Sequence, residues 1–176
     1  MVTITISGTP GSGKTTVAKL LEKKLGLKHI YLGKVFRELA NEHKMTLEEF
    51  GKYCEEHCEI DKELDDIQLN ILKKKKDVIL EGRLAGWLAY RNKIPAFKIL
   101  IDADLETRVK RIVNREEGLL EKRKKEIKER EKCEAKRYKD YYGINVKDKS
   151  IYDFVIDSAN KTPKEIVGLI IKKLNG

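Results

Sequence analysis

A glycine-rich stretch near the start of the chain, SGTPGSGKTT at residues 7–16, has the residue types that bind phosphate groups. Gly8 is followed after four residues by Gly13, Lys14 and Thr15, which fits the pattern G-x-x-x-x-G-K-[ST]. Glycines let backbone N–H groups turn inward around an anion, the lysine reaches the β and γ phosphate oxygens, and the threonine hydroxyl can ligate Mg²⁺. The residues expected to contact ATP in this loop are Gly8, Thr9, Pro10, Gly11, Ser12, Gly13, Lys14, Thr15 and Thr16, with Thr15 holding Mg²⁺ through the nucleotide.

The segments on either side of this loop support that reading. Residues 2–7, VTITIS, are a short β-branched run that predicts a strand. Residues 14–26 have apolar side chains at helical spacing and end in a glycine, which predicts a helix. A phosphate bound by the loop would therefore lie at the positive end of a helix.

The positions of two arginines indicate that the acceptor of the phosphoryl group is a molecule that itself carries a phosphate. Water is disfavoured, because NKIP at Asn92 lacks the aspartate of a guanine-reading motif and Gln68 is the single glutamine available to orient a water. Arg37 follows the second predicted strand, and Arg83 lies just past a buried one. Guanidinium groups at the carboxyl ends of strands can hold a phosphate in a bidentate manner.

Further arginines follow in two charged helical segments. Arg108 lies in ETRVKRIVNR, and Arg130 and Arg137 lie seven residues apart in REKCEAKR, which puts both on one helix face. Each arginine could instead be a solvated or salt-bridged surface residue. We expect Arg108, Arg130 and Arg137 to contact the phosphate groups of the bound nucleotides.

Strands and helices alternate along the whole chain, and this pattern predicts an α/β fold with a parallel sheet between helices. The expected strands are 2–7, 28–32, 77–82, 97–103 and 152–157. Thr46 and Thr162 each have a glutamate three residues later, so both are predicted N-caps. Two long excursions, about 33–76 and 117–145, should rise beside the carboxyl ends of the strands within a single domain of residues 1–176.

Composition favours a protein that acts on anions in the cytoplasm. The formal net charge is +9, and 38% of the residues are charged. No apolar run has membrane-spanning length, and MVTITISG has no signal-peptide features. Cys54, Cys58 and Cys133 are expected to be packed thiols rather than metal ligands.

Several of these stretches together resemble a known family. GTPGSGKTT, GKVFR, EGRLAGW and the segment ending EAKRYKDYYGI resemble the nucleoside monophosphate kinases, and more closely the archaeal-type cytidylate kinases. The resemblance covers essentially the whole chain. It implies a P-loop kinase fold with a five-stranded parallel sheet, an NMP-binding helical region, a lid, and transfer of the γ-phosphoryl of ATP to CMP or dCMP.

The resemblance also implies roles for individual residues. Arg37, Arg83 and Arg108 would hold the acceptor nucleotide, and Glu134 would contact its ribose. Lys14, Arg130 and Arg137 would stabilise the phosphoryl group in transit, and Asn160 would border the ATP base. Since a phosphate oxygen is already anionic, no general base is required. We expect a monomer whose partners are CMP, dCMP and ATP, without a stable nucleic-acid or membrane partner.

Some residues remain open at this stage. Asp61 and Asp65 could meet the base or ribose, or form a solvated helix face. Glu81 could hold the metal through water or orient Arg83. Another nucleoside monophosphate kinase, adenylate- or uridylate-preferring, and a nucleic-acid-binding ATPase remain as alternatives, since no residue is cytosine-specific on physical grounds alone.

Overall fold

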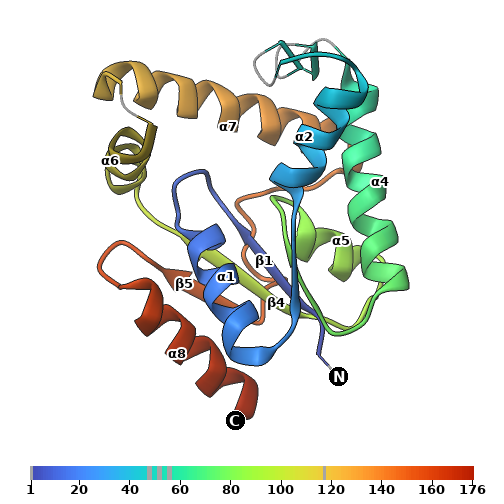
Figure 1. The fold of residues 1–176 in the computed structure, drawn as a ribbon, viewed down its shortest axis with the longest axis vertical. Helices are drawn as coiled ribbons and strands as arrows, with labels where there is room; N and C mark the ends of the chain where they lie inside the picture. The colour runs from blue at the N-terminus through green and yellow to red at the C-terminus, as the bar shows by residue number, and fades with distance from the viewer. Residues whose placement is uncertain (1, 47–48, 51–52, 55–56, 117) are drawn as a thin grey trace.

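The computed structural model describes residues 2–46, 49–50, 53–54, 57–116 and 118–176, with the side chains of residues 58, 59, 61, 116 and 133 left out. Five parallel strands form one sheet in the order β2-β3-β1-β4-β5, which confirms the predicted fold class (Figure 1). The strands are β1 (Ile4–Gly8), β2 (Lys28–Tyr31), β3 (Val78–Glu81), β4 (Phe97–Asp102) and β5 (Phe154–Asp157).

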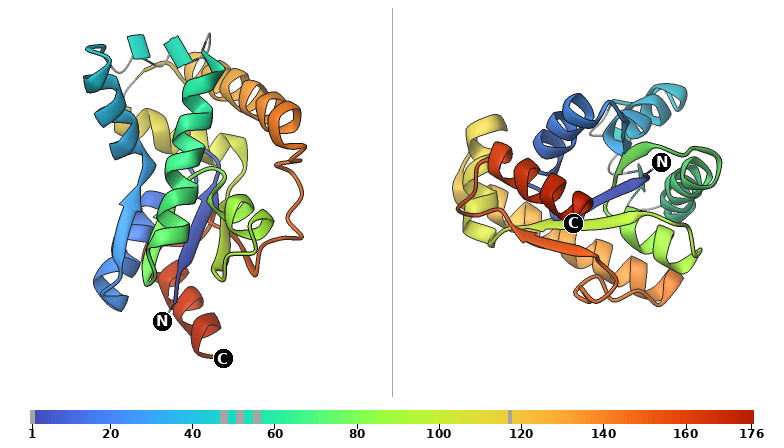
Figure 2. Two further views of the ribbon diagram at one scale, coloured as in Figure 1. Left: turned by 90° about the vertical axis from the view of Figure 1, so that its right-hand side faces the viewer. Right: turned by 90° about the horizontal axis from the view of Figure 1, so that it is seen from below.

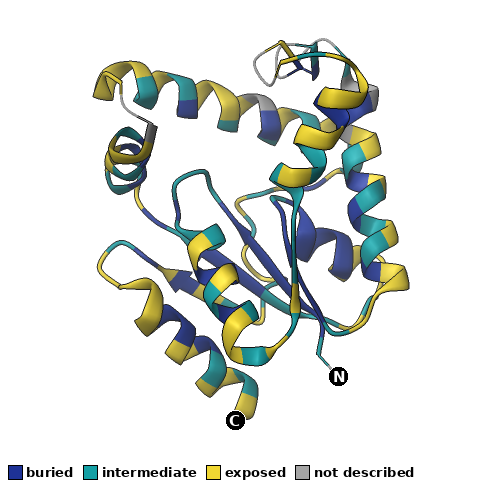
Figure 3. Ribbon diagram, in the orientation of Figure 1, coloured by how far each residue is buried: buried dark blue, intermediate teal, exposed yellow. Residues whose placement is uncertain are grey.

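The central strand β1 separates two apolar cores, because its side chains alternate between the faces of the sheet. Ile4 and Ile6 are fully buried against α1 (Lys14–Leu25) and α8 (Pro163–Asn175). Ser7 points to the opposite face, where its hydroxyl accepts a hydrogen bond from the Gly86 amide at 3.1 Å. Figure 3 shows the strands as the buried centre of the molecule.

The second face of the sheet is covered by α5 (Ala85–Arg91) and by residues of α4 (Cys58–Lys74). Sequence reasoning did not predict α5. Its buried residues include Gly86 and Ala89, and the lack of a polar face removes the periodic signal that identifies a surface helix. Trp87, 8% exposed, packs in this core.

Three further helices of the described part of the chain stand over the carboxyl ends of the strands. These are α2 (Leu32–Glu42), α6 (Leu105–Glu116) and α7 (Leu120–Tyr142). Figure 1 shows α7 crossing above the sheet from α6 to the side of α2 and α4, with both chain termini at the opposite end. The left view of Figure 2 also shows α2, the upper part of α4 and α7 at the same end of the molecule.

Both predicted helix caps are present. Thr162 and Glu165 form a reciprocal capping box at the start of α8. Thr46 and Glu49 exchange the same pair of bonds, while most of the helix predicted over 46–56 lies outside the described residues. No described helix has the length and apolar character needed to cross a membrane.

Candidate active site

The glycine-rich loop between β1 and α1 is anchored on both sides by its neighbours. Thr9 Oγ1 donates to Asp102 Oδ1 at 2.7 Å, and Gly11 and Gly13 have left-handed backbone φ angles of 81° and 87°. A Cβ at Gly11 would lie 2.8 Å from the Arg108 carbonyl oxygen, so α6 packs directly on the loop. The loop conformation is therefore imposed by β4 and α6 as well as by its glycines.

Thr15 and Glu81 form a group of oxygen ligands beside this loop. The Thr15 hydroxyl donates to Glu81 Oε1 at 2.6 Å, and His29 Nε2 lies 2.9 Å from Glu81 Oε2. A hydroxyl and a carboxylate are the hard ligands that Mg²⁺ accepts, so these two residues fit the ion that accompanies ATP. Bound there, the ion would neutralise charge on the phosphates. His29 was not anticipated as a neighbour of this group.

Two cavities meet at Lys14. The first, about 550 Å³, lies among α2, α4, α7 and the end of β3, and the second, about 410 Å³, lies among the loop, α6 and the turn after β5. Lys14 and Arg130 line both cavities, as do Pro10, Tyr31 and Glu81. Two ligands bound in these cavities would meet at Lys14 and Arg130, and each volume is within the range of small-molecule sites.

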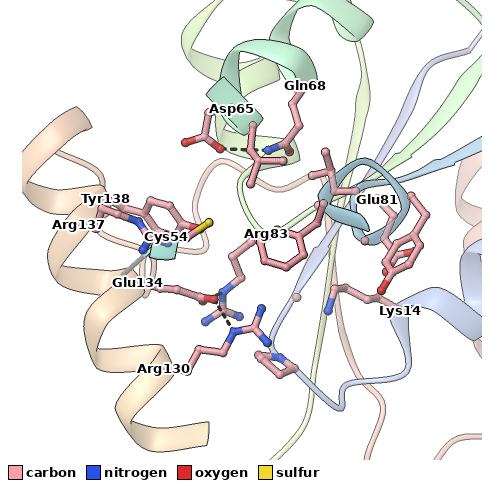
Figure 4. A pocket seen from close by; sticks show the side chains of 18 of the residues that line it. Lys14, Cys54, Asp65, Gln68, Glu81, Arg83, Arg130, Glu134, Arg137 and Tyr138 are labelled. Atoms are coloured by element: carbon pink, nitrogen blue, oxygen red, sulfur yellow. Dashed lines mark hydrogen bonds and ion pairs between the residues drawn. The ribbon is translucent and has the colours of Figure 1, made fainter. Parts of the chain in front are cut away.

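The first cavity gathers arginines from three separate segments, as the sequence predicted. Arg37 of α2, Arg83 after β3, and Arg130 and Arg137 of α7 all line it. Figure 4 shows Arg83 and Arg130 directed toward Glu134, with Lys14 nearby on the loop. A cluster of this kind can bind a phosphate monoester, because guanidinium groups match its oxygens bidentately.

Glu134 balances this positive charge. It is 6% exposed and lies 2.8 Å from Arg83 Nε and 2.9 Å from Arg130 Nε. Burial alone would raise the pKa of this carboxyl, but the charges of Arg83 and Arg130 outweigh burial and lower the pKa. A predicted contact of Glu134 with a ribose stays a prediction.

The pKa of Lys14 is also lowered, but for a lysine this disfavours the charged form. Burial lowers its pKa from 10.5 to about 8; Glu81 opposes the shift, while Arg83 and Arg130 add to it. An anionic ligand would relieve this unfavourable environment. The lysine is therefore suited to phosphate oxygens.

Arg108 of α6 contacts the glycine-rich loop and α7. Its guanidinium donates to the Pro10 carbonyl at 3.3 Å and pairs with Glu131 at 2.7 Å, and the residue is 6% exposed. Arg108 lines neither of the two cavities, and its predicted contact with the acceptor stays a prediction.

The second cavity contains residues that sequence reasoning ranked low or missed. Arg111 and Arg115 of α6 line it together with Ser158 and Lys161. Asn160, expected beside the ATP base, is exposed between Ser158 and Lys161. The i, i+4 spacing of Arg111 and Arg115 places both on one face of α6, which is the signal that could have identified them.

Metal binding by cysteines finds no support in the described part of the chain. Cys54 is a buried cysteine that lines the first cavity. No group of three or more His, Cys, Asp or Glu within the described residues could hold a metal ion. The side chains of Cys58 and Cys133 lie outside that description.

The fold, the loop and the paired cavities define a P-loop kinase. Among solved structures, a protein from Eubacterium ventriosum has a TM-score of 0.74 at 20% identity, over 100% of this chain and 99% of its own. Shikimate kinase from Bacteroides thetaiotaomicron has a TM-score of 0.66 at 14% identity, over 99% of both chains. These similarities concern the fold.

Sequence comparisons show to which family of P-loop kinases the chain belongs. The model of the cytidylate kinase-like family matches residues 3–160. A cytidylate kinase of Thermococcus kodakarensis is 46% identical over 95% of this chain and 84% of its own length. A cytidylate kinase of Methanocaldococcus jannaschii is 48% identical over 89% of this chain and 88% of its own. The chain belongs to the cytidylate kinase-like family.

Proposed function

We propose that the chain transfers the γ-phosphoryl group of ATP to CMP and dCMP. The observation that carries the proposal is the pair of cavities that share Lys14 and Arg130. ATP fits the cavity that contains the phosphate loop and the turn after β5. The monophosphate fits the cavity lined by Arg37 and Arg83, and membership of the family supports cytosine as its base.

The chemistry needs positioning and charge neutralisation rather than proton abstraction. A monophosphate oxygen is already anionic, so it can attack in line once both nucleotides are bound. Lys14 and Arg130 are placed to stabilise negative charge on the group between the two cavities. Thr15 and Glu81 would hold Mg²⁺ on the ATP side.

The helical segments above the sheet would exclude water during the transfer. We propose that residues of about 33–76 form the NMP-binding region and that residues of about 117–145 act as the lid. Arg137 would join the phosphates when α7 closes. Since the residues of both cavities come from one chain, a monomer is sufficient for this activity.

An assay of ADP release tests the proposal directly. Wild-type protein, ATP and Mg²⁺ are combined in turn with AMP, CMP, dCMP, UMP, GMP or no acceptor, and the diphosphate products are identified by chromatography. We expect fast ADP release with CMP and dCMP and none without an acceptor. ADP release that is independent of a monophosphate but stimulated by polynucleotide would instead identify a nucleic-acid-dependent ATPase.

A further inference from the structure

Two polar residues of α4 lie in the first cavity away from its arginines. Gln68 and Asp65, 3% and 7% exposed, both line this cavity. In Figure 4 they lie at the end opposite Arg130, with Arg83 between the two ends. A nucleotide whose phosphate meets the arginines would direct its base toward Gln68.

The orientation of the Gln68 amide is fixed by its neighbour. Gln68 Nε2 donates to Asp65 Oδ1 at 3.0 Å, and Asp65 Oδ2 accepts a hydrogen bond from the Tyr142 hydroxyl at 3.0 Å. An ionised carboxylate can only accept hydrogen bonds, so the amide must turn its NH₂ group to Asp65. The carbonyl oxygen of Gln68 must then face the other way.

That carbonyl oxygen has no hydrogen-bond partner among the described residues, although it is buried. It lies beside Gly82, where an added Cβ would collide with the amide. A buried acceptor without a donor is unfavourable, and most such groups in proteins are satisfied. The arrangement therefore favours a ligand that brings a donor to this acceptor after a small adjustment of the side chain.

We propose that Gln68, held in one orientation by Asp65, selects cytosine over uracil. The inference rests on the proposed function, since it concerns the base of the acceptor nucleotide. The Gln68 carbonyl oxygen would accept a hydrogen bond from the exocyclic amine of cytosine, and the second N–H of Nε2 would donate to the ring nitrogen N3.

Uracil presents the reverse order, an N–H at N3 and a carbonyl oxygen at position 4. Pairing with uracil would require the amide to turn over. Its carbonyl oxygen would then meet the Asp65 carboxylate, and two acceptors would face each other without a proton between them. Adenine presents an amine and a ring nitrogen in the same order as cytosine, so this device discriminates against uracil and leaves adenine to be excluded by the shape of the cavity.

The substitution Asp65→Asn tests this mechanism with almost no change of shape. An asparagine amide can donate or accept, so Gln68 becomes free to turn over. We expect the ratio of kcat/KM for UMP to kcat/KM for CMP to rise roughly tenfold, within the range attributed to one bidentate base contact. The ratio of kcat/KM for AMP to kcat/KM for CMP should stay within about twofold, because adenine and cytosine use the same orientation of Gln68. General damage to the site would lower kcat/KM for all three nucleotides and would not favour UMP.

The matched control is Asp66→Asn, which makes the same chemical change at an exposed position next along α4. In this variant the kcat/KM ratios of UMP to CMP and of AMP to CMP should equal those of the wild type. If Asp65→Asn fails to fold, Gln68→Leu removes both polar atoms that would contact cytosine and should raise the UMP ratio, because CMP loses two hydrogen bonds that UMP does not make.

A binding measurement gives a readout independent of catalysis. Gln68 is the single glutamine of the sequence, so ¹⁵N-glutamine labelling yields one side-chain NH₂ pair in an NMR spectrum. We expect CMP to shift both amide protons of the wild type and UMP, at equal occupancy, to shift them far less. In Asp65→Asn both nucleotides should shift them.

The outcomes separate the inference from the proposed function. Wild-type protein that phosphorylates no monophosphate contradicts the function. Wild-type protein that phosphorylates CMP, together with an unchanged UMP ratio in Asp65→Asn and Gln68 resonances that ignore CMP, leaves the function standing and overturns the role of Gln68.

Discussion

Glu134 Oε2 lies 2.8 Å from Arg83 Nε, which joins α7 to the loop after β3 across the first cavity. The second carboxylate oxygen of Glu134 accepts a hydrogen bond from Arg130 at 2.9 Å. One buried anion thus holds two arginines that face the proposed transfer site. Glu134 is negatively charged, as a phosphate group is, and it compensates these arginines when no nucleotide does so.

The first prediction concerns this compensation. Glu134→Gln keeps the shape of the side chain but removes its charge, so we expect the free energy of unfolding at pH 7 to fall by about 2 kcal/mol. Urea denaturation measures the change. Glu129→Gln, at an exposed position of α7 with a side chain 63% exposed, is the control and should change stability by less than about 0.5 kcal/mol.

The pH dependence of that difference follows from the pKa of Glu134, which the arginines lower from its ordinary value of 4.5. A carboxyl with a lowered pKa contributes stability above its unfolded-state pKa and loses it as the pH falls through the folded-state pKa. The gap between wild type and Glu134→Gln should be constant above about pH 5 and shrink in acid. A gap that widens in acid would contradict the ionised state of Glu134.

Arg83 supplies the second prediction, because it lies between the phosphate end and the base end of the first cavity. Arg83→Lys keeps the charge but loses the planar fork that binds a phosphate bidentately. We expect kcat/KM for CMP to fall roughly a hundredfold. Arg123→Lys, on α7 in an ion pair with Glu126, should retain wild-type kinetics, and equal losses in both variants would refute the assignment.

The fold was largely predictable from the sequence because its signals are local. All five strands appear within a few residues of the predicted ranges, since apolar β-branched runs bounded by glycine or charge mark buried strands. The capping residues Thr46 and Thr162 are equally local. Helix α5 was missed because five consecutive buried residues, 85–89, leave no amphipathic pattern.

The site residues were predictable where a sequence motif sets their spacing. Contacts between segments far apart in the sequence were not predictable. The loop and the arginines at strand ends follow from spacing alone. The pairing of His29 with Glu81 spans β2 and β3, and that of Arg108 with Glu131 spans α6 and α7, so only tertiary structure reveals them. The Asp65–Gln68 pair is local, at i and i+3 on α4, and its spacing could have been noticed.

The third prediction uses the pKa of Lys14, lowered to about 8 chiefly by burial. Above that pH the lysine of the free protein is neutral, and ATP binding must return a proton to it. We expect ATP affinity, measured by calorimetry, to decline as the pH rises above about 8. Lys14→Arg binds ATP with a fixed charge, so its affinity should not show this decline, and identical profiles would contradict the role of Lys14.

The fourth prediction concerns stability and also follows from the lowered pKa of Lys14. A charged Lys14 destabilises the nucleotide-free protein, because the unfolded chain binds its proton more tightly. Lys14→Met should raise the free energy of unfolding at pH 7 by roughly 1–3 kcal/mol. The gain should diminish between about pH 8 and 10.5, where the wild-type lysine becomes neutral in the folded state, and a constant gain would contradict the shift.

Arg111 leads to the fifth prediction, since it joins three segments around the second cavity. Its guanidinium donates to the Ser158 carbonyl at 2.6 Å, to the Ser158 hydroxyl at 3.0 Å and to the Ser12 carbonyl at 3.4 Å. Because the second cavity is the proposed ATP site, Arg111→Met should raise KM for ATP about tenfold or more. At saturating ATP, KM for CMP should stay within about twofold, because Arg111 does not line the first cavity.

The control for this split is Lys110→Met, which removes a positive charge at an exposed neighbouring position of α6. It should leave both KM values unchanged, because charge at that distance is screened by salt. Should Arg111→Met raise KM for CMP as strongly as KM for ATP, the two cavities would not be separate nucleotide sites. An effect on ATP alone would support the assignment of the loop, α6 and the turn after β5 to the phosphoryl donor.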